Sequence, residues 1–183
     1  MNAAENKNVL FPGVKDGESF KIADMEFIKF PSKNGQTPVV MKDIAFRSRF
    51  GSNNDLRSSI VLKRMREEWL PTIIEAIGAE NLCTIHTDLT TEDGLKPYGV
   101  MESLVSLPTL DFYRQNVEIF DKHNPGTWWW LATPESAQPH CEPYWVLCVS
   151  PSGYLLYHHY CDYFNGVRPF YIFKSSIFES FEE

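Results

Sequence analysis

The sequence predicts a single α+β domain, with helices in the N-terminal half and an antiparallel, β-rich C-terminal half. The clearest helical periodicity lies between Asn54 and Gly78, and from Gly126 onward short apolar runs alternate with turn signals. Helical and strand segments are therefore separated along the chain instead of alternating as βαβ units. The length of 183 residues suits one domain with a sizeable core.

The predicted strands follow period-two alternation or short β-rich runs bounded by turn residues. Residues 1–18 are rich in polar and turn-forming residues and are expected to form a flexible lead-in, so the domain would span residues 19–183. Strands or hairpins are predicted over residues 20–28, 38–41, 128–131, 145–149, 154–157 and 167–173. A turn over residues 150–153 would join two of them as a hairpin.

Two consecutive helices are predicted from their caps and an apolar face. Asn54 or Asp55 is expected to cap the first helix, because both side chains accept hydrogen bonds from free backbone amides. Pro71 suits the first turn of the second helix, where a missing amide hydrogen costs nothing. Gly78 then ends that helix.

The charge balance disfavours several kinds of partner. Acidic residues outnumber lysine and arginine by 24 to 17, and the net charge is −7. Nonspecific binding to nucleic acid or to an anionic membrane needs clustered basic residues, so neither is expected. Apolar runs are too short for a membrane span, and residues 1–5 lack a signal peptide's apolar segment. We therefore expect no membrane insertion, folding in a cytoplasm, and cysteines that are mostly reduced.

The C-terminal segments carry a resemblance to a known family. Trp129-Trp130-Leu131, Thr133-Pro134, the hairpin from Val149 to Gly153 and the closing Gly166-Val167-Arg168-Pro169 resemble a pattern common in gut bacteria, prophages and phages. The resemblance covers residues 45–173 and is strongest over 128–173. It implies a C-type-lectin-like fold, similar to the formylglycine-generating-enzyme group and to variable proteins of diversity-generating retroelements. In such proteins a β-rich scaffold presents one face to a ligand.

The segment from Tyr157 to Asn165 is the most unusual in the chain. It consists of Tyr, His, Cys, Asp, Phe and Asn, which are the residues that adenine-directed randomisation of Asn codons produces. Aromatic anchors beside small polar groups are also typical of paratopes. The predicted contact residues are Tyr144, Trp145, Tyr157, His158, His159, Tyr160, Asp162 and Tyr163. The alternative is that these aromatic residues belong to an ordinary core strand or loop.

Zinc binding and nucleophilic catalysis are rival uses of the same residue types. The candidate zinc ligands are His140, Cys141, Cys148, His158, His159 and Cys161. Four of them form the adjacent pairs His140-Cys141 and His158-His159, whose side chains would point to opposite faces of a strand, and CxxC and HxxxH spacings are absent. Cys83 with His86, or Cys161 with His158, would need an orienting group that nothing nearby in the sequence supplies. We therefore predict no metal, no cofactor and no catalytic residue.

The sequence thus predicts a non-enzymatic ligand-binding or display protein of phage or prophage type. Its partner would be a protein or a cell-surface glycan of a host bacterium, and a homo-oligomer or a virion assembly is compatible with this role. Synthesis would take place in the bacterial cytoplasm without a signal peptide, followed in one version by association with the virion. The alternative is an intracellular phage-encoded interaction protein that inhibits a host defence protein. Arg168 is expected to be structural, with its guanidinium holding backbone carbonyls or a carboxylate.

Overall fold

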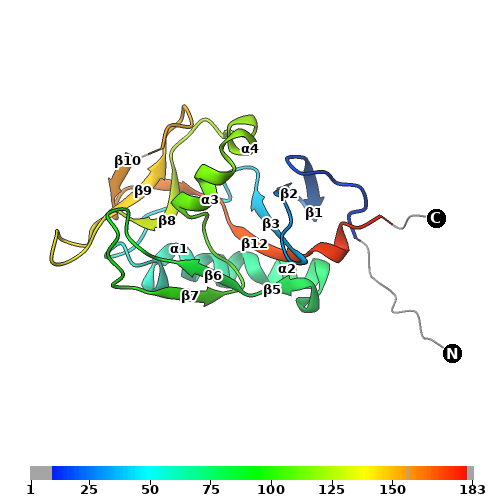
Figure 1. The fold of residues 1–183 in the computed structure, drawn as a ribbon, viewed down its shortest axis with the longest axis horizontal. Coiled ribbons are helices and arrows are strands. Elements are labelled where there is room, and N and C mark those ends of the chain that lie inside the picture. Colours follow the sequence, from blue (N-terminus) through cyan, green and yellow to red (C-terminus); the bar gives the residue numbers. More distant parts are fainter. Residues whose placement is uncertain (1–9, 156, 181–183) are drawn as a thin grey trace.

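The protein has a mixed α+β fold in which sheets predominate over helices (Figure 1). The computed structural model describes residues 10–155 and 157–180, except for the side chain of Tyr157. The predicted α+β class is confirmed. In the described residues, no helix has the length and apolar character needed to cross a membrane.

The first sheet is antiparallel and joins the two ends of the chain. Its strand order is β1 (Ser19–Ile22), β2 (Met25–Lys29), β3 (Gln36–Met41), β12 (Phe170–Lys174) and β5 (Leu82–Cys83). The late strand β12 therefore lies between two early strands, and a short 3-10 helix η4 (Ser175–Ile177) follows it. The amides of Leu10 and Phe11 both donate to the carbonyl of Ile177, at 3.1 and 2.8 Å.

The second sheet holds the segments that the sequence analysis singled out. Its order is β10 (Tyr157–Tyr160), β9 (Trp145–Val149), β8 (Trp129–Pro134), β11 (Asn165–Val167) and β4 (Phe46–Ser48). The β11–β8 pair is parallel, and the other pairs are antiparallel. A separate two-stranded ribbon pairs β6 (Ile85–Asp88) with β7 (Val100–Ser103).

Helical segments occupy the middle of the chain. The first run comprises η1 (Leu56–Ser58), α1 (Ile60–Arg64), a π-helical turn η2 (Met65–Trp69), α2 (Leu70–Ile77) and η3 (Ala79–Asn81). The second comprises α3 (Leu110–Gln115) and α4 (Val117–Lys122). Asp55 caps η1, whereas Ser59 caps α1 by accepting from the amide of Leu62 at 2.9 Å. Pro71 lies in the first turn of α2, and Gly78 ends it at φ +84°, as predicted.

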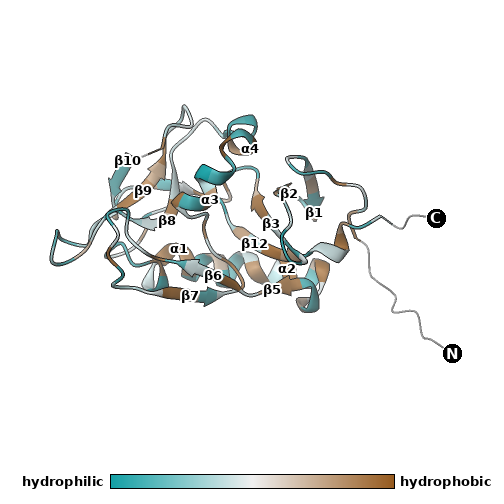
Figure 2. Ribbon diagram, in the orientation of Figure 1, coloured by the Kyte–Doolittle hydropathy of each residue, from teal (hydrophilic) through white to brown (hydrophobic). Residues whose placement is uncertain are grey.

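The core has two parts that meet at β8. Trp130 belongs to a cluster that includes the first sheet, α1 and α2, while Trp129 faces α3 and α4. Adjacent strand residues point to opposite faces, and both tryptophans are buried, so both faces of β8 are covered here. Figure 2 shows the contrast between largely hydrophobic β3 and β12 and hydrophilic β10 at the edge of the second sheet.

Two details of the predicted architecture are corrected by the structure. Four strands precede the first helix, and α3 and α4 fall in the second half, so the division into a helical and a β-rich half is wrong. The C-terminal half is also not wholly antiparallel, because β11 runs parallel to β8. Within the expected lead-in, residues 1–9 lie outside the described residues, whereas the Phe11 ring packs 4.8 Å from that of Phe20.

The segment predicted as one strand over residues 167–173 serves both sheets. It forms the end of β11 and most of β12, and the chain changes sheets at Arg168 and Pro169. The guanidinium of Arg168 is fully buried and donates to the carbonyls of Met41 at 3.0 Å and Lys42 at 2.9 Å. It also lies 4.7 Å from the ring of Trp129. The predicted structural role of Arg168 is confirmed.

Candidate functional site

The candidate site is assembled where β9 begins and β10 ends. In the β9–β10 ladder Tyr160 lies opposite Trp145, and His159 lies opposite Val146. The amide of Cys161 continues the pairing beyond β10 by donating to the carbonyl of Tyr144 at 2.8 Å. This ladder brings together predicted contact residues that are about fifteen positions apart in sequence.

Tyr144, Trp145 and Tyr160 form the first group of rings. The Tyr160 ring lies 5.5 Å from each of the other two, at 50° to Tyr144 and 81° to Trp145. The Trp145 side chain remains 40% exposed. Next to this group, a pocket of about 300 Å³ is lined by residues that include Arg49, Tyr160 and Asp162.

His159 organises a second group of rings. Its imidazole lies 4.4 Å from the ring of Trp128 and 5.1 Å from that of Tyr163. His159 Nδ1 lies 2.9 Å from the side-chain nitrogen of Asn165 and 3.2 Å from its side-chain oxygen, so the Asn165 amide can pair with either tautomer of the ring. Burial lowers the pKa of His159, which favours the neutral ring. Tyr163 is 54% exposed and the adjoining Phe164 is 66% exposed.

His158 has a different environment from its neighbour His159. Its Nε2 lies 2.7 Å from a carboxylate oxygen of Glu92, and its Nδ1 lies 3.1 Å from one of Glu135. The backbone amide of Glu92 donates to the carbonyl of Pro134 at 2.9 Å, which holds the loop of residues 90–94 against the end of β8. The imidazole is therefore fixed by two carboxylates and is not freely presented to solvent.

Asp93 ties the same loop to the segment that precedes β9. Its carboxylate accepts from His140 at 2.7 Å, from the hydroxyl of Ser136 at 2.5 Å and from that of Thr91 at 2.5 Å. The bond from His140, followed by those from the two hydroxyls, holds the pKa of Asp93 well below its usual range. His140 and Ser136 are more than 40 positions away from Asp93, so local sequence gives no sign of these two partners.

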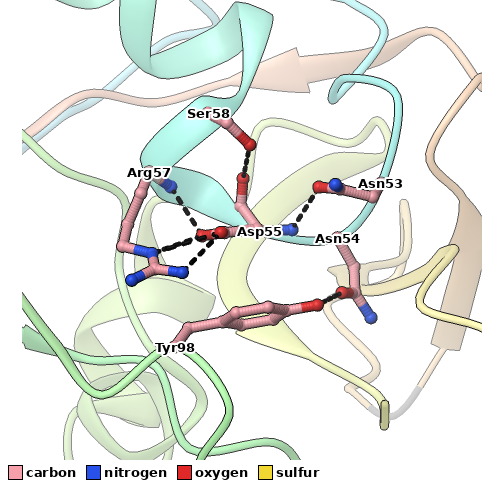
Figure 3. Close-up of polar contacts among 6 residues, drawn as sticks. All are labelled: Asn53, Asn54, Asp55, Arg57, Ser58 and Tyr98. Atoms are coloured by element: carbon pink, nitrogen blue, oxygen red, sulfur yellow. Dashed lines mark hydrogen bonds and ion pairs between the residues drawn. The ribbon is translucent and has the colours of Figure 1, made fainter. Parts of the chain in front are cut away.

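A buried asparagine, Asn54, anchors the segment that carries Tyr144 and Trp145. Figure 3 shows its side-chain bond with the Tyr98 hydroxyl. The Asn54 side-chain nitrogen donates to the carbonyls of Ser136 at 2.8 Å and Trp145 at 3.1 Å. Its side-chain oxygen accepts from the Tyr98 hydroxyl at 2.6 Å, and its backbone amide donates to Pro143 at 2.8 Å. The sequence predicted Asn54 only as a helix cap, whereas in the structure its side chain fixes the start of β9.

The predicted contact residues thus do not all point outward together. One group contains Tyr144, Trp145 and Tyr160, a second contains His159 and Tyr163, and His158 turns to the carboxylates. Asp162 is exposed and lies 3.3 Å from a guanidinium nitrogen of Arg49, while the Tyr157 side chain lies outside the described residues. Sequence reasoning omitted three neighbours of these groups, namely Trp128, Phe164 and Arg49. Phe164 was within the segment singled out, and its adjacency to Tyr163 was the available signal.

The residues considered for chemistry are dispersed. Across the described part of the chain, groups of three or more His, Cys, Asp or Glu arranged to hold a metal ion are not found. Cys161 is buried, which raises the pKa of its thiol, and His158 is bonded to Glu92 and Glu135. Burial also raises the pKa of Cys83, and His86 lies 3.4 Å from Glu102. Raised thiol pKa values lower the thiolate fraction at neutral pH.

Comparison with protein-family models, with curated proteins and with solved structures finds no match for this chain.

Proposed function

We propose that this chain is a non-enzymatic recognition protein that binds a protein ligand through the aromatic surface at the start of β9 and the end of β10. We define the aromatic surface as Tyr144, Trp145, Tyr160, Tyr163 and Phe164. The observation that carries the proposal is the exposure of Trp145 at the start of β9 and of Tyr163 and Phe164 in the segment that follows β10, where the Tyr163 amide bonds the Tyr160 carbonyl. Exposed large aromatic side chains on a fixed backbone are typical of interface anchors.

The local structure favours binding because much of the surface is already ordered. Trp145 and Tyr160 are held by the β9–β10 ladder, and Asn54 fixes the carbonyl of Trp145. Ordering a flexible side chain at an interface costs about 0.5–1.5 kcal/mol, so rings held in place before binding reduce that cost. Tyr and Trp also lose little conformational entropy for the area that they bury.

The resemblance to phage and prophage proteins suggests a biological setting for this proposal. A C-type-lectin-like scaffold is supported by the position of the late strand β12 between β3 and β5 and by the bond from Leu10 to Ile177. In that setting the protein would be made in the bacterial cytoplasm and would recognise a host protein. It would do so either as a virion component or as an intracellular inhibitor of a defence protein.

A capture experiment with matched variants tests the proposal. The wild-type chain and a Trp145→Ser/Tyr163→Ser/Phe164→Ser variant are immobilised and exposed to extract of the host bacterium and to a glycan array. A Val100→Ser/Val117→Ser variant is the control, because both valines are exposed on other elements. We expect one protein to bind the wild type and the control but not the aromatic variant. Equal capture by all three proteins, or binding of a glycan alone, would contradict the proposal.

A further inference from the structure

The second sheet has an open edge beside the aromatic surface. Among the described strands, β10 pairs with β9 alone, so its other side has no strand partner. An edge strand presents backbone N–H and C=O groups that another extended chain can bond. Figure 1 shows β10 at the outer limit of this sheet.

The hydrogen bonds around β10 show which backbone groups face the open edge. Cys161 donates to Tyr144, which lies on β9's side of the ladder, so the amide of every second residue, including His159, also faces β9. His158 and Tyr160 therefore direct their N–H and C=O groups away from β9. The Tyr160 carbonyl accordingly accepts from the Tyr163 amide at 2.9 Å, within the following turn. The amide and carbonyl of His158 and the amide of Tyr160 remain for an added strand.

β10 lacks two of the features by which edge strands usually avoid such pairing. Its residues, Tyr-His-His-Tyr, include no lysine and no proline. The opposite edge strand of this sheet, β4, has only three residues and carries the exposed Arg47. The edge strand β1 of the first sheet likewise carries the exposed Lys21. The open side of β10 is therefore the least protected of these three edges.

The charges beside β10 indicate the chemistry of the occupant. Three carboxylates, those of Glu92, Asp93 and Glu135, surround two imidazoles, those of His140 and His158. The carboxylates outnumber the imidazoles, so a negative charge remains even with both rings protonated. A basic segment complements this charge, whereas a second copy paired through β10 would place two such clusters near each other.

We propose that β10 is a strand-addition site that takes a basic, extended segment of a partner protein. The inference rests on the proposed function, because the segment would lie beside Trp145 and Tyr160. Its backbone would bond His158 and Tyr160, and its basic side chains would approach Glu92 and Glu135. The open edge supplies affinity through backbone bonds, and the rings and carboxylates supply selectivity.

Amide hydrogen exchange of the full chain with a synthetic peptide is the direct test. The probe is an acetylated and amidated (Lys-Val)₅ peptide, and (Glu-Val)₅ is its matched control. With about nine-tenths of the protein occupied, exchange at His158 and Tyr160 should slow about tenfold, because only the free fraction exchanges. The His159 amide, which already bonds β9, should be unaffected, and the acidic peptide should protect neither residue.

A pair of variants separates the backbone contribution from that of the ring. Tyr160→Ala removes the ring and keeps the amide, whereas Tyr160→Pro removes both. Proline is tolerated where an edge amide faces outward, and thermal unfolding checks that both variants fold. The proline variant should bind (Lys-Val)₅ about fivefold more weakly than the alanine variant, the value of one hydrogen bond.

Other results would overturn strand addition. These are failure of (Lys-Val)₅ to bind, binding without protection at His158 and Tyr160, or equal affinity for the two peptides. Self-association through β10, seen by sedimentation as a dimer that a folded Tyr160→Pro variant cannot form, would replace the proposed occupant with a second copy. If strand addition fails while the aromatic variant still loses a captured protein, the proposed function stands and only this binding mode is rejected.

Discussion

Replacing Asn54 with alanine should destabilise the protein and loosen the segment that carries the candidate site. The side chain makes three hydrogen bonds, to the carbonyls of Ser136 and Trp145 and from the hydroxyl of Tyr98. Each such bond contributes about 1 kcal/mol net, and a buried carbonyl left without a donor costs a further 1–3 kcal/mol or so. Because Tyr98 is only partly buried, water can replace its lost partner. We expect Asn54→Ala to lower the free energy of unfolding by about 3–4 kcal/mol.

Urea denaturation measures this change through the midpoint, provided that the slope is unaltered. Asn53→Ala is the matched control, because the Asn53 side chain makes one bond, 2.9 Å from the amide of Asp55, in a half-buried position. Asn53→Ala should lower the free energy of unfolding by about 1 kcal/mol or less. Tyr98→Phe alone should lower the free energy of unfolding by about 1 kcal/mol. Added to Asn54→Ala, it should lower it almost no further, because the bond is already lost. Equal midpoints for the Asn54→Ala and Asn53→Ala variants would refute the anchoring role.

Three further predictions concern other parts of the fold. A Cβ on Gly166 would lie 2.6 Å from Cδ1 of Ile44, so Gly166→Ala should lower the free energy of unfolding in urea by about 1–3 kcal/mol. Ile44→Val removes Cδ1 and should recover part of this loss in the Gly166→Ala background. No recovery would argue against the clash. Arg168→Met should lower the unfolding free energy by about 3 kcal/mol, because the buried bond to the Met41 carbonyl and the partly buried bond to the Lys42 carbonyl are lost, and an unchanged thermal midpoint would disprove this. The folded state lowers the pKa of Asp93, mainly through the bond from His140, so its stabilisation is present above the ordinary value of 3.8 and disappears as pH falls below it. Urea midpoints measured from pH 5 to pH 2 should therefore fall more steeply for the wild type than for Asp93→Asn, and identical slopes would contradict the assignment.

Sequence reasoning was most successful where the determinants are local. The α+β class, the helix end at Gly78 and the place of Pro71 in the first turn of α2 all follow from the backbone preferences of nearby residues. The structural role of Arg168 was also predictable, because an arginine within an apolar run must find acceptors when it is buried.

The remaining features depend on contacts between distant segments. The insertion of β12 between β3 and β5 and the parallel pairing of β11 with β8 are properties of the whole chain, which local periodicity does not encode. Asn54 illustrates the same limit at the site. Its cap-like composition predicts a helix start, but its partners at Ser136 and Trp145 are more than 80 residues away.

The different environments of His158 and His159 were likewise not evident from the sequence. Adjacent strand residues point to opposite faces, so the two rings were bound to differ, but their partners come from distant parts of the fold. The first binds Glu92 and Glu135, and the second contacts Trp128 and pairs with the Asn165 side chain. A surface predicted as one patch therefore became two ring groups beside an acidic cluster.

The most direct test of recognition through the aromatic surface is a map of amide protection with the captured host protein bound to the full chain. The account predicts slower exchange at residues 144–145 and 158–164, with little change in the first sheet and in α1 and α2. Protection confined to those distant elements, with residues 144–145 and 158–164 exchanging as in the free protein, would contradict it.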